Sequence, residues 1–175
     1  IICVASLQYR KGQDIIINLL PELYKIIPEF KLHLVGPQTQ PFTSKLLKHK
    51  NFNKYKKHIK IWGKRKDIYP LIYASDVFLF PTRAEAFPRV ILEAMSLKTP
   101  IISSNVDGIS EMLENNISGL LFKHNDYNKI ITNISLIYNN KKIKNKIIEN
   151  AYNKYWSDFS REKQINRYSK FLKKL

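Results

Sequence analysis

The stretch that decides the fold runs from Ser75 to Met95 and reads SDVFLFPTRAEAFPRVILEAM. It contains an apolar run from Val77 to Phe80 without alternation, which is typical of a strand covered on both faces. Pro88 then marks the first turn of a helix, because proline is pre-organised for that position and loses no needed donor there. We therefore predict a buried strand, a loop, and a helix from about Pro88 to Leu97.

Outward from this unit, apolar runs of strand length alternate with segments of helical period. The predicted strands are Ile1 to Ala5, Lys31 to Val35, His58 to Trp62, Val77 to Phe80, Pro100 to Ser104 and Gly119 to Phe122. The predicted helices are Gln13 to Ile27, Thr43 to Lys50, Asp67 to Ala74, Pro88 to Leu97 and Ile109 to Glu114, with helix throughout from Asp126. A parallel crossover has to return through a helix. The pattern thus predicts an α/β fold, a doubly wound, Rossmann-like parallel sheet of about six strands, with a helical C-terminal tail.

The composition describes one globular domain of 175 residues, with 44% hydrophobic and 25% charged residues. Cys3 is the single cysteine and lies in an apolar run, so we expect a small buried hydrophobe and no Cys-based metal site. No apolar run approaches the roughly 18 residues that span a bilayer. Because the chain opens on a strand without an initiating Met, we expect it to be a piece of a longer protein.

The net charge of +16 at pH 7 leaves several interpretations open. Nucleic acid, an anionic membrane surface and phosphorylated ligands are all partners that suit a basic domain. Lysine is spread over Lys45 to Lys66, Lys141 to Lys146 and Lys170 to Lys174, among many Asn and Ile residues. An AT-rich coding sequence produces the same mixture without selection for any partner.

Ligands of doubly wound sheets bind beyond the carboxyl ends of the strands, so three loops are of interest. The first carries Arg10 and Lys11 just ahead of a helix, where cations and the helix dipole suit a phosphate, although it lacks the glycine pattern of a P-loop. The second carries Glu85 before the helix that begins near Pro88, whose backbone N–H groups beside Ala86 and Phe87 suit a phosphate or a sugar hydroxyl.

Glu93 lies about a turn and a half inside the same helix, and its side chain tilts back toward the loop of Glu85. A solvent-exposed Glu93 and a Glu85 that only favours the helix dipole are the simple alternative. The apolar neighbours of Glu93 argue against it; they are Val90, Ile91, Ala94 and Met95. The third loop, Val106 to Glu111, offers backbone donors and Asp107, or is a plain turn before a capped helix.

With these residues in view, nearly the whole chain resembles the C-terminal domain of the retaining glycosyltransferases of family 4 (glycosyl transferases group 1), which have the GT-B fold. The specific tract is two glutamates separated by seven residues, Glu85 and Glu93, followed by Ala94-Met95. The segments Trp62 to Ile68, Tyr73 to Val77, Asp107 to Glu111 and Ser118 to Leu121 resemble further landmarks of the family.

The resemblance implies a donor site without a metal ion or other cofactor. Glu85 would be the catalytic residue and contact the hydroxyls of the donor sugar, Glu93 would hold the ribose, and Lys11 the diphosphate. The donor-binding residues implied are Arg10, Lys11, Gly63, Lys64, Arg65, Ala86, Phe87, Pro88, Arg89, Val90 and Glu93. Backbone near Gly63 to Arg65 would hold the base of a UDP- or GDP-sugar.

The implied reaction is transfer of a hexosyl-type sugar to a glycan or lipid-linked acceptor, with retention of configuration. Residues 1–175 would form the nucleotide-sugar-binding domain, including C-terminal helices from about residue 141, and an acceptor-binding N-terminal domain would precede Ile1. We expect the isolated domain to bind a nucleotide sugar weakly and not to turn it over. The expected location is cytoplasmic, with peripheral contact at the cytoplasmic membrane face and no nucleic acid partner.

Three departures from the family pattern stand in the loops. Ala5-Ser6 replaces Gly-Arg, which removes one phosphate-binding cation, and Ala86-Phe87-Pro88 replaces Gly-Phe-Gly. Asp107 replaces a glycine and is expected to bring a carboxylate near the donor pocket and to alter sugar preference. The alternatives left open are a basic nucleic-acid-binding module and a glycosyltransferase-like binding subunit without catalysis.

Overall fold

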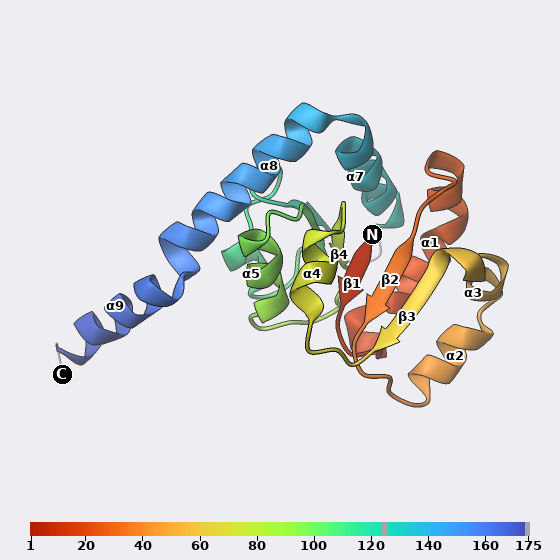
Figure 1. Cartoon of the computed structure of the whole chain (residues 1–175), viewed down its shortest axis with the longest axis horizontal. Coiled ribbons are helices and arrows are strands. Elements are labelled where there is room, and N and C mark those ends of the chain that lie inside the picture. Colours follow the sequence, from red (N-terminus) through yellow and green to blue (C-terminus); the bar gives the residue numbers. More distant parts are fainter. Residues whose placement is uncertain (124–125, 174–175) are drawn as a thin grey trace.

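The computed structural model describes residues 1–123 and 126–173, and its centre is one parallel sheet (Figure 1). The strands are β1 (Ile2–Val4), β2 (Leu32–Val35), β3 (Ile59–Gly63), β4 (Phe78–Phe80), β5 (Ile101–Ser104) and β6 (Leu120–Phe122). Their order in the sheet is β3-β2-β1-β4-β5-β6, and all five pairings are parallel. The predicted doubly wound, Rossmann-like sheet is confirmed.

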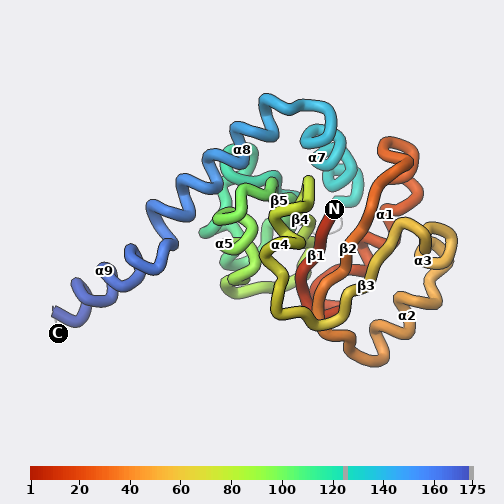
Figure 2. The backbone as a smooth tube through the Cα atoms, viewed as in Figure 1, coloured from red at the N-terminus to blue at the C-terminus, as the bar shows by residue number. Residues whose placement is uncertain are grey.

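Helices connect the strands and form the C-terminal tail (Figure 2). They are α1 (Gln13–Ile26), α2 (Phe42–Lys48), α3 (Lys50–Lys54), α4 (Ile68–Tyr73), α5 (Arg89–Ser96), α6 (Ile109–Met112), α7 (Tyr127–Asn139), α8 (Lys141–Lys154) and α9 (Arg161–Leu172). Three short segments join them: the 3-10 turns η1 (Tyr9–Lys11) and η2 (Lys56–His58), and the π-helical segment η3 (Tyr155–Phe159). The end of the predicted closing helix, residues 174–175, lies outside the described residues.

Two predicted helical segments are broken by local capping. The predicted helix from Thr43 to Lys50 ends at His49, whose extended backbone and ring nitrogen instead cap α3. The tail is interrupted at Asn140 and Ser160, and each of these side chains accepts a hydrogen bond from a backbone N–H in the first turn of the helix that follows. Asn and Ser are preferred at such positions because their oxygens satisfy donors that the helix itself leaves free.

The core consists of two apolar layers, one on each face of the sheet. Cys3, Leu34 and Leu79 point to the face covered by α1, α2, α3 and α7, whereas Phe78 and Phe80 point to the face covered by α4, α5, α6 and α8. Cys3 is buried, which raises the pKa of its thiol to about 12, so its predicted role as a small hydrophobe is confirmed.

From β1 the chain adds β2 and β3 on one side of the sheet and then crosses to add β4, β5 and β6 on the other side. The order of the strands therefore reverses between the neighbours β1 and β4. At such a switch point the loops after the two central strands diverge and leave a crevice at the carboxyl edge. The two loops here are residues 5–12 after β1 and 81–88 after β4, which are the loops that carry Lys11 and Glu85. The topology therefore brings two separately predicted loops to one place.

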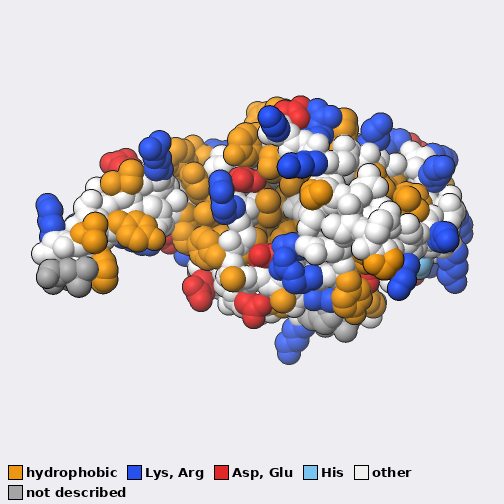
Figure 3. All heavy atoms as spheres, turned by 90° about the horizontal axis from the view of Figure 1, so that it is seen from below, with side chains coloured by type: hydrophobic (Ala, Val, Ile, Leu, Met, Phe, Trp, Pro, Cys, Tyr) orange, Lys and Arg blue, Asp and Glu red, His pale blue; other side chains and the backbone are white. Residues whose placement is uncertain are grey.

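Helix α9 extends from the body as an arm (Figure 1). None of its residues is buried, and one side carries the exposed apolar residues Ile165, Tyr168, Phe171 and Leu172. Hydrophobic side chains on this arm are visible in the space-filling view (Figure 3). Within residues 1–123 and 126–173, no helix has the length and apolar character needed to cross a membrane.

Candidate functional site

Lys11, Arg10 and Glu85 meet at the switch point. The Nζ atom of Lys11 forms an ion pair with Oε2 of Glu85, and Nη1 of Arg10 lies 3.4 Å from the same oxygen. The side chains of Lys11 and Glu85 are only 12% and 15% exposed, so the pair is largely removed from water. A phosphate approaching this edge would meet two cations and one carboxylate, in the place where the sequence predicts the donor diphosphate and sugar.

Close backbone contact holds the two loops together. Gly12 ends the 3-10 turn η1 with φ 74°, and a Cβ atom built on it would lie 1.9 Å from the carbonyl oxygen of Pro81. Only glycine fits both this conformation and this contact. Nη1 of Arg10 also donates a 2.8 Å hydrogen bond to the carbonyl of Ala84, so Arg10 holds the loop of Glu85 as well as facing its carboxylate.

The loop after β5 contacts the same edge. The carboxylate of Asp107 accepts a 3.1 Å hydrogen bond from the backbone N–H of Glu85, and Asp107 takes a left-handed conformation with φ 40°. A Cβ on Gly108 would lie 1.6 Å from the carbonyl oxygen of Ala86. The expected carboxylate is therefore beside Glu85, where it occupies one of the backbone donors of this loop.

Glu93 lines a groove of about 480 Å³ between α4, α5 and the π-helical segment η3. Its Oε2 atom is buried and has no hydrogen-bond partner among the described residues. Burial raises the pKa of the Glu93 carboxyl, and the nearby Arg89 works in the opposite direction. The solvent-exposed alternative for Glu93 is wrong, because the residue is half-buried and its Oε2 atom is buried in a groove that Tyr155 and Phe159 also line. An unpaired buried acceptor is suited to ligand hydroxyl groups.

The remaining predicted donor residues border these features. Pro88 occupies the N-cap position of α5 and is buried, and Val90 is half-buried. Phe87 is exposed and packs edge-on against Phe159, with 5.9 Å between the two ring centroids. Ala86 is exposed at the loop tip, and Arg89, the first residue of α5, is exposed as well. The predicted donor residues from Ala86 to Val90 thus lie at the start of α5, next to the loop of Glu85.

Gly63 ends β3, and Lys64 and Arg65 follow it at the same edge of the sheet, two strands away from β1 on the β2 side of the switch point. The guanidinium of Arg65 lies 4.8 Å from the centroid of the Trp62 ring and pairs with Asp67. The Trp62 indole donates a 3.0 Å hydrogen bond to His33. No described hydrogen bond or ion pair joins these residues to Glu85, so the structure does not bring them into the Lys11–Glu85 cluster.

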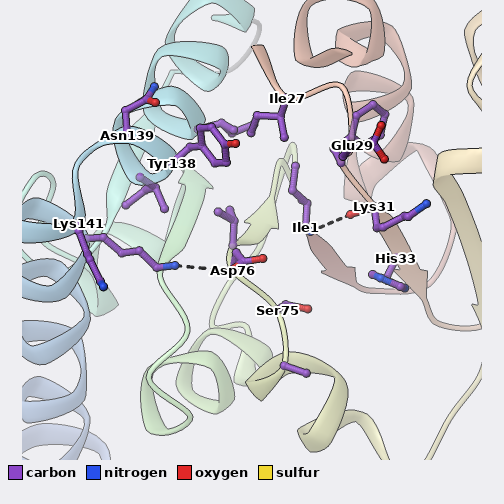
Figure 4. Close-up of a pocket in the computed structure, with 16 residues that line it drawn as sticks. Ile1, Ile27, Glu29, Lys31, His33, Ser75, Asp76, Tyr138, Asn139 and Lys141 are labelled. Carbon is purple, nitrogen blue, oxygen red and sulfur yellow. Dashed lines mark hydrogen bonds and ion pairs between the residues drawn. The ribbon is translucent and has the colours of Figure 1, made fainter. Parts of the chain in front are cut away.

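A cavity of about 710 Å³ lies at the opposite, amino edge of the strands (Figure 4). Ile1, Glu29, His33 and Asp76 are among its lining residues, and none of the predicted site residues is. The terminal ammonium of Ile1 donates to the carbonyl of Lys31 at its wall. Because ligands of doubly wound sheets bind at the carboxyl edge, this cavity is not the candidate site.

The described residues contain no group of three or more His, Cys, Asp or Glu side chains placed to hold a metal ion.

Sequence reasoning missed an ion pair beside the site: the guanidinium of Arg83 donates to both carboxylate oxygens of Asp14. The sequence offered a signal for Arg83 alone, a cation between a buried strand and Glu85, and no local signal for its partner Asp14.

Fold and site together define a Rossmann-like α/β domain with a cluster of charged side chains at the carboxyl edge of its switch point. The family model described as "Glycosyl transferases group 1" matches residues 1–154, and the chain belongs to this family.

Relatives and solved structures agree with this assignment. The chain is 34% identical, over 112 residues, to UDP-Gal:alpha-D-GlcNAc-diphosphoundecaprenol alpha-1,3-galactosyltransferase of Escherichia coli, covering 64% of this chain and 29% of that enzyme. It is 31% identical to the capsular polysaccharide biosynthesis glycosyltransferase CapM of Staphylococcus aureus over 102 residues, covering 56% of this chain and 27% of CapM.

The fold matches Anabaena HepE in complex with UDP, with a TM-score of 0.90 and 24% identity over 99% of this chain and 48% of HepE. It also matches the C-terminal domain of a glycosyl transferase group 1 family protein of Francisella tularensis, with a TM-score of 0.80 and 19% identity over 91% of this chain and 86% of that domain. The chain therefore spans less than a third of these two curated relatives and about half of HepE.

Proposed function

We propose that this chain is the donor-binding, C-terminal domain of a retaining family 4 glycosyltransferase with the GT-B fold. Family membership and the fold support this assignment, and so does the extent of the Francisella domain, which nearly equals that of this chain. The E. coli relative is named for a UDP-sugar donor and a lipid-linked acceptor. By analogy, the proposed reaction transfers a hexosyl-type sugar from a UDP- or GDP-sugar to a glycan or lipid-linked acceptor.

The ion pair of Lys11 with Glu85, with Arg10 beside it, is the observation that carries the proposal. It places a cation suited to a phosphate, Lys11, and a carboxylate suited to sugar hydroxyls, Glu85, next to each other in a largely buried position at the switch point. A nucleotide sugar needs both groups within a few ångströms, because its diphosphate is bonded directly to the sugar.

The proposed roles follow the order of the donor. Lys11 and Arg10 hold the diphosphate together with the free N–H groups at the start of α5, and Glu85 holds the sugar hydroxyls. Glu93, with its unpaired buried oxygen, accepts from the ribose hydroxyls. Backbone from Gly63 to Arg65 holds the base at the outer side of the crevice.

In the proposed reaction the bond between the anomeric carbon and the diphosphate oxygen breaks, and a bond to the acceptor oxygen forms on the same face. The proton of the acceptor hydroxyl passes to the departing diphosphate. The cations of the β1 loop lower the barrier by stabilising the charge that develops on this leaving group. The reaction needs no metal ion in this scheme, and it needs an acceptor-binding N-terminal domain, so the isolated domain binds the donor and does not turn it over.

Binding of the chain to UDP, GDP and their common sugar conjugates, followed by ligand-observed NMR at two salt concentrations, tests the proposal. The expected result is selective binding of one nucleotide that weakens by about tenfold in Glu93→Ala, because the ribose loses an acceptor. An oligonucleotide is the control for the +16 charge. Oligonucleotide binding that falls steeply with salt, with no nucleotide binding, would instead identify a basic nucleic-acid-binding module.

A further inference from the structure

Arg83 connects three segments around the candidate site. Its guanidinium donates to both carboxylate oxygens of Asp14, at 2.9 and 2.7 Å, and to the backbone carbonyl of Tyr9. It also stacks on the Tyr9 ring, with the guanidinium carbon 3.8 Å from the ring centroid. The Arg83 side chain is 14% exposed and that of Asp14 30%, so this is a partly buried, two-pronged pair, the strongest geometry for such an interaction.

The backbone repeats the same connection. The N–H of Arg83 donates a 2.7 Å hydrogen bond to the carbonyl of Arg10, and the buried hydroxyl of Thr82 lies 3.0 Å from that carbonyl. The β4 loop is therefore fastened to the β1 loop directly behind Lys11 and Glu85. We call the contacts of Arg83 with Asp14, Tyr9 and the carbonyl of Arg10 the clamp. Asp14 belongs to the first turn of α1, so the clamp also fixes the start of that helix.

The clamp also sets the charge of the site. Three cations, Arg10, Lys11 and Arg83, share the region with the three carboxylates of Asp14, Glu85 and Asp107, so the two signs balance. Without Arg83 the carboxylate of Asp14 would stand unneutralised three residues from Lys11. A negative charge there would oppose a diphosphate at the same loop.

We propose that Arg83 is a positioning residue, which through Asp14 and Tyr9 holds the β1 and β4 loops in the one arrangement that places Lys11 beside Glu85. This inference rests on the proposed function. Arg83 does not touch the donor in this account; it acts through Lys11, which does.

The test compares UDP and UMP affinities (or GDP and GMP, whichever the wild type binds) for wild type, Arg83→Met, Arg83→Lys and the double variant Arg83→Met/Asp14→Asn. The double variant lacks the Arg83–Asp14 pair but has the same net charge as the wild type, so it separates position from charge. Lys144→Met removes one positive charge at the opposite edge of the sheet, where Lys144 faces Asp76, and serves as the matched control. Thermal unfolding followed by circular dichroism identifies a temperature at which every variant is folded, and the affinities are measured at that temperature.

Arg83→Met is expected to weaken binding of the diphosphate roughly tenfold and that of the monophosphate much less, since the clamp acts on the loop that holds the second phosphate. The double variant remains as weak, Arg83→Lys recovers only part of the affinity, and Lys144→Met changes little. In a Lys11→Ala background Arg83→Met adds less than about twofold, because the residue through which it acts is gone. Restoration by the double variant, or additivity with Lys11→Ala, would overturn the proposal.

Hydrogen exchange of the ligand-free chain judges the clamp independently of any nucleotide. The amides of Lys11 and Arg83 both donate to loop carbonyls, and Arg83→Met and Asp14→Asn are expected to speed their exchange selectively. Unchanged protection at both amides would contradict the proposal. If the wild type bound no nucleotide, the proposed function would fail, and this exchange measurement would still decide whether Arg83 orders the loops.

Discussion

Glu93 carries a carboxylate oxygen that is buried without a hydrogen-bond partner in residues 1–123 and 126–173, an arrangement that costs stability while the group is ionised. Burial raises its pKa above the ordinary 4.5, so the folded chain binds its proton more tightly than the unfolded chain does. In the window between 4.5 and the raised value, stability therefore falls as pH rises. A ligand hydroxyl that donates to this oxygen would offset the cost in the bound state.

Glu93→Gln is expected to raise the midpoint of thermal unfolding at pH 7.5, because the amide keeps the shape and removes the buried charge. The gain should shrink as pH falls toward 4.5, where the wild-type carboxyl is protonated too. Thermal unfolding followed by circular dichroism across this range checks it, with the exposed Glu22→Gln as control. A Glu93→Gln variant less stable than wild type at pH 7.5 would show that the carboxylate has a stabilising partner.

At the level of single residues, sequence reasoning works where the information is local. The inward orientation of Glu93 follows from its apolar helix neighbours, and Lys11 and Glu85 are adjacent to helix starts. The Arg83–Asp14 pair joins residues 69 positions apart, and no local pattern connects them. Its prediction requires knowing that β1 and β4 are neighbours in the sheet.

The loops after β1 and β4 work as one element because they touch through backbone. Gly12 has both a left-handed conformation and a carbonyl oxygen of Pro81 where its Cβ would be. Gly63 has a similar φ of 67°, but nothing lies within 4 Å of its missing Cβ. A substitution at either glycine would therefore strain the left-handed backbone, but only a substitution at Gly12 would also clash with Pro81.

Gly63→Ala is expected to lower the unfolding free energy by about 1 kcal/mol, the cost of a left-handed alanine. Gly12→Ala should cost roughly 2–4 kcal/mol, because overpacking against the Pro81 backbone adds to the same strain. Urea unfolding of the two variants measures the difference. Equal losses would mean that the two loops separate freely, contrary to the account of a fastened pair.

The strands were predicted to within one residue at each end, because each is a short, mainly apolar run bounded by turns, even where a single polar residue such as His33 or Lys60 interrupts it. The strand order was not predictable in the same way: alternation with helices indicates parallel pairing but not which strands are neighbours. The break at His49 was also missed, since the same histidine can either continue a helix or cap the next one. The packing of α3 against α1 decides between these two conformations.

For the whole molecule, the arm formed by α9 extends away from the body of the domain (Figure 1). Deleting residues 161–175 is expected to leave the unfolding midpoint almost unchanged, since α9 has no buried residue. Self-association at high concentration should fall, because the deletion removes the exposed side of Ile165, Tyr168, Phe171 and Leu172. Circular dichroism and sedimentation velocity measure the two effects. A midpoint lowered by more than about 5 °C would show that the arm supports the domain.

The charge of +16 is also a property of the whole molecule. Lys and Arg side chains are scattered over the face in Figure 3 instead of gathering in one patch. The cations that the proposal uses are few and specific: Arg10 and Lys11 at the switch point, ordered by Arg83.

The most direct test of the donor-binding claim is amide chemical-shift mapping of the labelled chain during titration with UDP and GDP. We expect saturable shifts for one nucleotide in residues 9–14, 63–65, 83–93 and 107–108, and little change around the amino-edge cavity of Ile1 and Asp76. Shifts scattered over the exposed lysines, or concentrated at that opposite cavity, would contradict the claim that the carboxyl edge of this sheet binds a nucleotide sugar.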